Sequence, residues 1–291
     1  MSERSRGTTE DLVELGEISD RNRWNPGYFE DHFVEVERRL KELRAVPLGT
    51  YIPDLHPDKS KGITYGQVGA RELDPDGEVR YLQVVNIRDT GIDFAIKPDR
   101  VAEGSHNDPP RSRVLLGDIL FTNTAFRGTE TLLGRCVVVP RDFGKVNISQ
   151  DINRIRVSGA SAYYVAVYLK SKYGQSQIHR VIHGVDSQKI NFGRVRAILI
   201  PELSPSLQQL IKDEYLVMSD YHNSAMTIKE RLLAEAGIDP GRFGGEINAL
   251  AEEKPAYKRA LREAKERLDH LVTELEAVIE GRHDTLRPFP E

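Results

Sequence analysis

The 291-residue sequence contains little cysteine and no long apolar run. Its single cysteine, Cys136, excludes an intrachain disulfide, and the apolar neighbours Val137, Val138 and Val139 are typical of a small core residue rather than a nucleophile. The start of the chain is polar and acidic, and no window approaches the roughly 18 apolar residues of a membrane span. We therefore expect a cytoplasmic protein that is neither secreted nor inserted into a membrane.

The signatures of several enzyme classes are also missing. No G-x-x-x-x-G-K-[ST] is present, which excludes a conventional ATPase or motor, and no C-x-x-C or H-E-x-x-H spacing indicates a metal site. The segment Asn107-Asp108-Pro109-Pro110 faintly resembles the [DN]-P-P-[YF] motif of amino-methyltransferases, but Arg111 stands where that motif needs an aromatic to stack on a flipped base. We predict no catalytic residue, no metal and no cofactor.

Positive charge is concentrated in one part of an acidic chain. The formal net charge is -4, yet residues 111–200 hold fourteen Lys and Arg against five Asp and Glu. A segment of +9 in a chain whose remainder carries -13 is typical of a protein that binds phosphate groups. A solvated basic face is the alternative, because charge runs alone are weakly specific.

The sequence pattern changes twice and divides the chain into three parts. Residues 1–45 hold a tail and then an amphipathic helix, predicted over 28–43 from apolar residues spaced three or four apart. Residues 46–203 consist of short β-rich runs between turn residues. Residues 204–291 are helical, and heptad-spaced apolar positions predict coiled-coil-like helices over 206–236 and 257–280. These helices form an antiparallel hairpin or pair with another subunit, on either side of a glycine-rich break at 237–245.

The middle part predicts an irregular, mainly-β domain, so the fold class is α+β. Its clearest helix is expected over 160–173, ended by Gly174 as a C-terminal cap. The predicted strands are bounded by Gly, Pro and Asp and cover residues 81–87, 119–122, 135–139 and 152–157.

The stretch 177–201 combines polar side chains with an apolar framework. After a turn at His183-Gly184, a polar loop carries Gln188, Lys189 and Asn191, and a buried strand from Val195 ends at Pro201. Gln and Asn pair bidentately with adenine, and Lys contacts guanine or phosphate, so the loop has the chemistry of nucleic-acid readout. An ordinary polar loop is the alternative.

The β-rich domain resembles the target-recognition domain of type I restriction-modification specificity subunits. Motifs in a characteristic order, followed directly by a long helix, carry this resemblance over roughly residues 46–280. They are YLQVVNIRDTGID (81–93), VLLGDILFT (114–122), GRCVVVP (134–140), NISQDINRIRV (147–157), YLKSKYG (168–174) and HGVDSQKINFGRVRAILIPELSPSLQQLI (183–211). The segments RWNPGYF (23–29) and VPLG (46–49) are similar to the lead-in of such domains.

The resemblance implies a subunit without activity of its own. Such a subunit reads a bipartite site in double-stranded DNA and holds methyltransferase subunits, and through them a restriction motor, on that site. This chain carries a single recognition domain, so it resembles a half-subunit, and we expect a homodimer through the C-terminal helices that reads an inverted site. In such subunits, helices separate the paired recognition domains and set the distance between the two half-sites. The glycine-rich break at 237–245 departs from that pattern.

Candidate DNA-binding residues follow from side-chain chemistry and position on the expected loops. We expect the Lys and most Arg to contact phosphates, and Asn, Gln and one or two Arg to specify bases. Ser149, Gln150, Gln188, Lys189 and Asn191 match the family pattern itself, which favours a role in holding loops in shape. The candidates are Lys59, Lys61, Tyr65, Gln67, Arg88, Asn123, Arg127, Asn147, Ser149, Gln150, Asn153, Arg154, Gln188, Lys189 and Asn191.

Two other functions remain open from the sequence. One is a recognition module with a Mg²⁺-dependent nuclease activity of its own, because paired-carboxylate motifs are short and divergent. The other is a coiled-coil adaptor whose basic segment binds an acidic protein.

Overall fold

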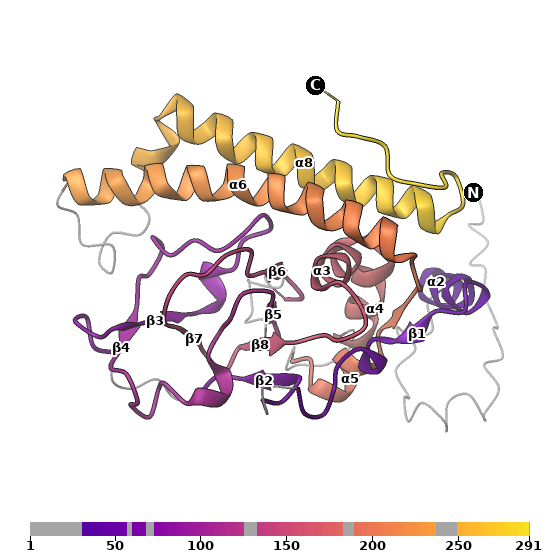
Figure 1. The fold of residues 1–291 in the computed structure, drawn as a ribbon, viewed down its shortest axis with the longest axis horizontal. Coiled ribbons are helices and arrows are strands. Elements are labelled where there is room, and N and C mark those ends of the chain that lie inside the picture. The colour runs from indigo at the N-terminus through magenta and orange to yellow at the C-terminus, as the bar shows by residue number, and fades with distance from the viewer. Residues whose placement is uncertain are drawn as a thin grey trace, which may run out of the picture.

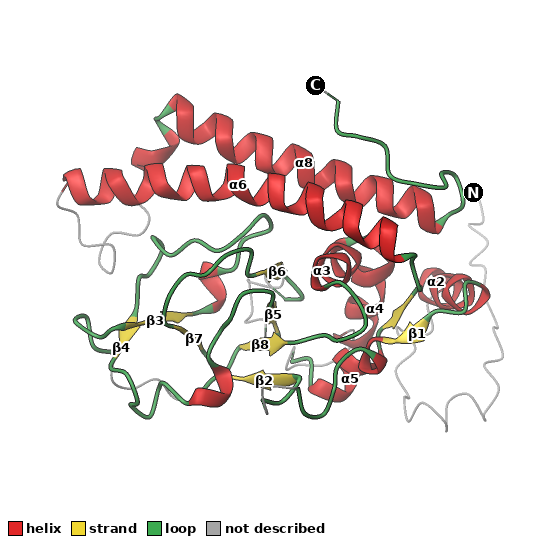
Figure 2. Ribbon diagram, in the orientation of Figure 1, coloured by secondary structure: helices red, strands yellow, loops and turns green. Residues whose placement is uncertain are grey.

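A computed structural model describes residues 31–56, 60–67, 73–124, 133–182, 189–236 and 249–290. A long helical hairpin lies along one side of a group of small sheets and short helices (Figures 1 and 2). The predicted α+β class is therefore confirmed. Within the described ranges, no helix is long and apolar enough to cross a bilayer.

In the described ranges, nine short strands pair in three sheets. The central sheet has four antiparallel strands in the order β2-β8-β5-β6, the second has the order β4-β3-β7, and β1 pairs with β9. β3 and β7 run parallel, whereas all other strand pairs are antiparallel. The strands are β1 (Val46–Pro47), β2 (Ile63–Tyr65), β3 (Val79–Leu82), β4 (Arg100–Val101), β5 (Ile119–Thr122), β6 (Cys136–Val138), β7 (Val146–Ile148), β8 (Ile152–Ile155) and β9 (Leu199–Ile200).

The helices lie along one side and at one end of the central sheet (Figure 1), and they share one core with it. α3 is buried along almost its whole length and contacts β6, α4, α6 and α8, because its sequence AYYVAVYLK is apolar on every face. The described helices are α2 (Asp31–Glu42), α3 (Ala162–Lys170), α4 (Lys172–Ile182), α5 (Phe192–Ala197), α6 (Pro205–Ala236) and α8 (Pro255–Ile279), with 3₁₀ turns η2 (Leu48–Thr50), η3 (Val84–Asn86) and η4 (Pro110–Ser112).

The predicted antiparallel hairpin is present. α6 and α8 lie side by side (Figure 1), with Met226 near the end of α6 in one apolar cluster with Tyr257 near the start of α8. Ile211 at the start of α6 shares the main core with Leu275 near the end of α8. The glycine-rich break lies outside the described residues. The main core also contains Phe121 of the β-rich part, so side chains from both sides of the expected 203/204 boundary are buried together.

The strand predicted over 81–87 is too long. β3 ends at Leu82, because the side chain of Asn86 accepts a hydrogen bond from the Gln83 backbone N–H at 2.7 Å and closes the 3₁₀ turn η3. The strand of residues 119–122 is confirmed with its predicted bounds, and β6 and β8 lie within the ranges predicted for them.

The helix predicted over 160–173 is two helices. Ser171 breaks it with an extended backbone, and its hydroxyl donates to the carbonyl of Tyr168 at 2.6 Å. Gly174 lies inside α4 and is not a cap. A Cβ at this position would lie 2.4 Å from the Tyr168 carbonyl oxygen, so glycine permits α4 to approach α3.

The strand predicted from Val195 is also corrected. Val195 lies in the short helix α5, which begins because the Asn191 side chain accepts a hydrogen bond from the Arg194 N–H at 3.0 Å. Only Leu199 and Ile200 form a strand there, β9. The helix predicted over 28–43 is described from Asp31, as α2.

Candidate nucleic-acid interface

The two edges of the central sheet have different surroundings. At the β6 edge, the backbone N–H of Val138 donates to the hydroxyl of Tyr215 on α6 at 3.0 Å, so this edge is covered by the hairpin. β2 forms the opposite edge, and together with α5 it lies on the side away from α6 and α8 (Figure 1). The β2 edge is therefore the edge of the central sheet that the hairpin does not cover.

An aromatic pair and a lysine lie together on this side. The ring of Tyr65, at the end of β2, is 39% exposed, and its centroid lies 5.4 Å from that of Phe192, the first residue of α5. The Nζ of Lys189 lies 5.9 Å from the Tyr65 centroid. The next residue, Ile190, is buried, and its backbone N–H donates to the carbonyl of Asn123 at 2.8 Å. This bond holds the backbone beside Lys189 in place. The result is an exposed flat ring beside an ammonium group.

A hydrogen-bonded set of three polar side chains follows directly along the chain. The Gln67 side chain accepts from Nη2 of Arg111 at 2.9 Å, and its Nε2 lies 2.8 Å from Nε2 of His106. His106 and Arg111 are exposed, and Gln67 is half-buried. We call Lys61, Tyr65, Gln67, His106, Arg111, Lys189 and Phe192 the β2-edge surface.

A fully buried arginine supports the β2-edge surface from below. Arg154 of β8 is 0% exposed, and its Nη2 donates to the carbonyls of Lys61 at 2.9 Å and of Arg111 at 3.1 Å. Its charge lies beside Asp118, which also forms an ion pair of 2.6 Å with Arg156. The predicted DNA-binding role of Arg154 is therefore replaced by a positioning role.

Three predicted asparagines are also buried among protein partners. Asn123 donates to the side-chain oxygen of Asn153 at 2.7 Å, and Asn147 donates to Asp108 at 2.8 Å. These side chains do not reach the surface in this structure, and we remove them from the expected contacts. Ser149 and Gln150 act through their backbones, which accept from the N–H of Gly66 at 3.2 Å and from the Asn123 amide at 3.2 Å.

The Asn107-Asp108-Pro109-Pro110 segment is a structural turn ahead of η4. Asp108 is buried and accepts from Nε of Arg113 at 3.1 Å and from the Gly104 N–H at 2.9 Å. Burial raises the pKa of the Asp108 carboxyl, but the hydrogen bonds it accepts, first among them that from Arg113, outweigh this effect and hold the pKa below its usual value. The Asp108 carboxylate is buried and already accepts hydrogen bonds from groups of the protein, so it does not face a target base.

The remaining predicted DNA-binding residues fall into three groups: some lie on the β2 side, one lies next to the hairpin, and some lie outside the described residues. Lys61, Lys189 and Asn191 are exposed on the β2 side. Arg88 lies elsewhere: its Nε is 3.8 Å from Asp93, and it lines a cleft with residues of α6 and α8. Lys59, Arg127 and Gln188 lie outside the described residues.

Comparison with known proteins identifies similar solved structures, among them two from type I restriction-modification systems. No family model and no curated protein matches the chain. The crystal structure of a type I restriction-modification system S subunit from M. genitalium is 12% identical and covers 66% of this chain and 43% of that chain, with a TM-score of 0.41. A chain from a structure concerning the assembly and conformational transition of the type I R-M system is 18% identical and covers 66% of this chain and 44% of that chain, with a TM-score of 0.37.

The fold is similar to that of a type I S subunit. This similarity agrees with the resemblance found in the sequence. The matched part spans less than half of either known chain.

Sequence patterns missed some residues of the β2-edge surface. His106, Arg111 and Phe192 were not among the candidates, although Arg111 belongs to the basic segment. Phe192 follows the capping residue Asn191, which is a detectable signal for the start of a helix. No local signal indicates that Phe192 meets Tyr65 or that His106 meets Gln67, because each pair is far apart in the sequence.

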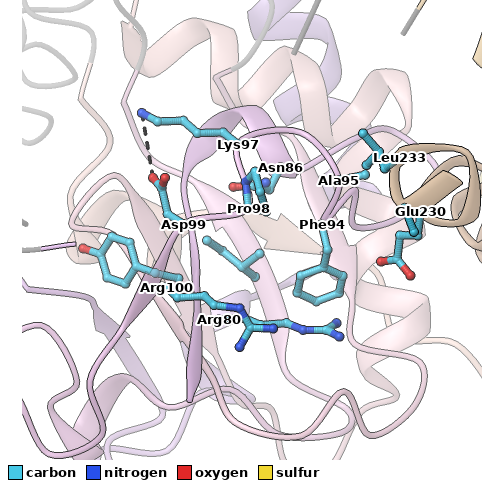
Figure 3. A pocket seen from close by; sticks show the side chains of 13 residues that line it. Arg80, Asn86, Phe94, Ala95, Lys97, Pro98, Asp99, Arg100, Glu230 and Leu233 are labelled. Atoms are coloured by element: carbon cyan, nitrogen blue, oxygen red, sulfur yellow. Dashed lines mark ion pairs between the residues drawn. The ribbon is translucent and has the colours of Figure 1, made fainter. Parts of the chain in front are cut away.

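A separate hollow of about 430 Å³ lies between β3, β4 and the end of α6 (Figure 3). Several of its charged groups have partners within the protein: Lys97 lies 4.0 Å from Asp99, and Arg100 donates to the carbonyl of Gly77 at 3.1 Å. Arg80 lies 4.6 Å above the ring of Phe94. Glu230 of α6 also lines the hollow.

Proposed function

We propose that this chain is the DNA sequence-recognition (specificity) subunit of a type I-like restriction-modification system. The observation that carries this proposal is the β2-edge surface, where cations, the Gln67 amide and the exposed ring of Tyr65 lie together above the buried Arg154. Cations bind phosphates, and amides with guanidinium groups read base edges in the major groove. The proposed function is non-catalytic.

The contacts divide by chemistry. Lys61 and Lys189 are exposed ammonium groups and serve as phosphate contacts, whereas the Gln67 amide, to which Arg111 donates, serves as a base reader. Tyr65 and Phe192 offer apolar ring surface for the sugar-phosphate edge or a thymine methyl group.

The helical hairpin supports the scaffolding part of the proposal. Leu210, Val217 and Tyr221 of α6 are exposed, although α6 buries other apolar residues against α8 and the core. Exposed apolar side chains along a helix favour contact with a protein partner. We propose that these helices hold methyltransferase subunits, and through them a motor subunit, and join two copies of the chain, so that the dimer reads a bipartite site.

Duplex binding by the purified full chain tests the recognition part of this proposal. Each phosphate contact that is lost reduces the slope of log K against log salt by about 1, so Lys61→Ala and Lys189→Ala are each expected to reduce the slope by that amount. Lys258→Ala, an exposed lysine on α8, is the matched control and is expected to keep the wild-type slope. Salt-insensitive binding by the wild type, or slopes unchanged in both variants, would contradict the proposal.

Two further experiments separate the alternatives. Co-purification with a methyltransferase subunit, followed by mapping of methylated adenines, is expected to show a bipartite site. Incubation of the pure protein with Mg²⁺ and plasmid is expected to leave the plasmid intact, whereas cleavage would establish an intrinsic nuclease.

A further inference from the structure

The side-chain amide of Gln67 has one defined orientation. Arg111 has only N–H groups to offer, so the amide atom that it reaches at 2.9 Å is the oxygen. The opposite end is therefore the NH₂ group, which donates to Nε2 of His106 at 2.8 Å. His106 consequently acts as an acceptor at Nε2 and carries its proton on Nδ1.

These two bonds leave half of the amide unused. The oxygen keeps one lone pair, and the nitrogen keeps one N–H. One acceptor next to one donor is the set that pairs bidentately with adenine, whose N6 donates and whose N7 accepts in the major groove. Guanine presents two acceptors there, and thymine presents an acceptor and a methyl group, so neither satisfies both atoms.

The backbone around Gln67 is held as firmly as its side chain. The N–H of Gly66 donates to the Ser149 carbonyl at 3.2 Å, and Gln67 forms a β-bridge with Ser149. A Cβ on Gly66 would lie 1.6 Å from the carbonyl oxygen of Ile148, so only glycine permits this approach. On the other side, Arg154 holds the backbone of Arg111. A donor and acceptor fixed in this way lose little freedom on binding.

We infer that Gln67, oriented by Arg111 and His106, is a specificity-determining residue that reads adenine in the major groove. This inference rests on the proposed function, because it names one base contact of the proposed DNA interface. Arg111 and His106 act as positioning residues for the amide.

Selection of preferred duplexes from a randomised library by the full chain tests this inference. The wild type is expected to select adenine at one position. Loss of a bidentate contact reduces the affinity ratio between the right and the wrong base by roughly 10- to 100-fold. Gln67→Ala is therefore expected to lose that much preference for adenine at this position and to keep its base preferences at the other positions. Gln67→Glu is expected to change the selected base to cytosine, whose N4 donates to a carboxylate. His106→Ala is expected to weaken the adenine preference at the same position, because the amide then rotates.

Gln209→Ala, an exposed glutamine on α6, is the matched control and is expected to select the wild-type sequence. Thermal unfolding of each variant checks that the fold is kept. A Gln67→Ala protein that selects the same sequence as the wild type would overturn the inference while leaving the proposed function standing. A wild type that selects no sequence at all would overturn both.

Discussion

The Nζ of Lys229 on α6 lies 2.7 Å from Oδ2 of Asp93 in the loop after η3, and their side chains are 1% and 3% exposed. The other oxygen of Asp93 accepts from the backbone N–H groups of Ala95 at 3.0 Å and Ile96 at 3.2 Å. Burial lowers the pKa of the Lys229 ammonium, and the neighbouring Asp93 opposes that effect. This buried ion pair fastens the β-rich part to the hairpin.

Removing one partner of this pair is expected to destabilise the protein strongly. Lys229→Ala leaves the buried Asp93 carboxylate without its nearest cation, and we expect a loss of about 3 kcal/mol in the free energy of unfolding. Urea denaturation measures this loss. Lys265→Ala removes the exposed pair with Asp269 and is expected to cost less than about 1 kcal/mol. Equal losses in the two variants would show that the buried pair does not fasten the hairpin.

Stability is expected to depend on the protonation of His222, which lies next to this pair. Its Nε2 donates to the carbonyl of Ile92 at 3.2 Å, and its Nδ1, 2.8 Å from the hydroxyl of Thr90, is the acceptor when the ring is neutral. Burial lowers the pKa of His222 below its usual 6.5, while Asp93 opposes and Arg88 and Lys229 reinforce the shift. The unfolded chain therefore binds the proton more tightly than the folded protein.

The sign of the pH effect follows from this difference. The stability contributed by neutral His222 is complete above the unfolded pKa and is lost as the pH falls below it. Urea denaturation from pH 8 down to about pH 5 is expected to show a smaller decrease for His222→Gln than for the wild type. Identical decreases would mean that His222 does not contribute.

Gly91 is expected to tolerate no side chain. A Cβ at this position would lie 2.3 Å from Cδ2 of His222, so Gly91→Ala forces the loop away from α6 and is expected to cost about 1–3 kcal/mol. The same substitution in a His222→Ala background is expected to cost much less, which a double-mutant cycle measures. Gly193→Ala, whose Cβ would meet only Asn191 at 3.4 Å, is the control with an expected change below about 1 kcal/mol.

The bond between Tyr215 and Val138 is expected to stabilise the covered sheet edge. Tyr215→Phe leaves the buried N–H of Val138 without this acceptor, and we expect a loss of about 1–3 kcal/mol, measured by thermal or urea unfolding. Tyr221→Phe removes a hydroxyl from an exposed tyrosine of the same helix and is expected to have almost no effect. A Tyr215→Phe protein as stable as the wild type would mean that another group satisfies the edge.

The parts of the fold that were predicted correctly depend on neighbours in the sequence. Heptad spacing fixes α6 and α8, and the apolar run of β5 is bounded by turn residues that the sequence displays. The predicted helix and strand bounds are wrong where a polar side chain forms a hydrogen bond with a nearby backbone group. Asn86 ends β3, Ser171 divides a helix, and Asn191 begins α5 where a strand was expected. Each of these polar residues occurs in many settings, so its type alone does not indicate its partner.

The candidate site was predicted less well for a related reason. The sequence indicates a basic region with amides, but the side chains of Asn147 and Arg154 have the same chemistry whether they meet a base or a carboxylate. Arg154 reaches the carbonyl of Lys61, 93 residues away, and Asn147 reaches Asp108, 39 residues away. Only the folded structure distinguishes Asn147 and Arg154, which have internal partners, from the half-buried Gln67 and the exposed Lys189.

The strand pairs of the β-rich part are nested along the chain. β1 with β9 encloses β2 with β8, which in turn encloses β3 with β7. During synthesis, β1, β2 and β3 therefore emerge long before the strands that pair with them. The β5–β6 pair is the most local of the antiparallel sheet, and we expect it to form first, with β8 and then β2 adding to it. Among these strand pairs we expect β1 with β9 to close last, so the β-rich part is complete only after residue 200 has been made.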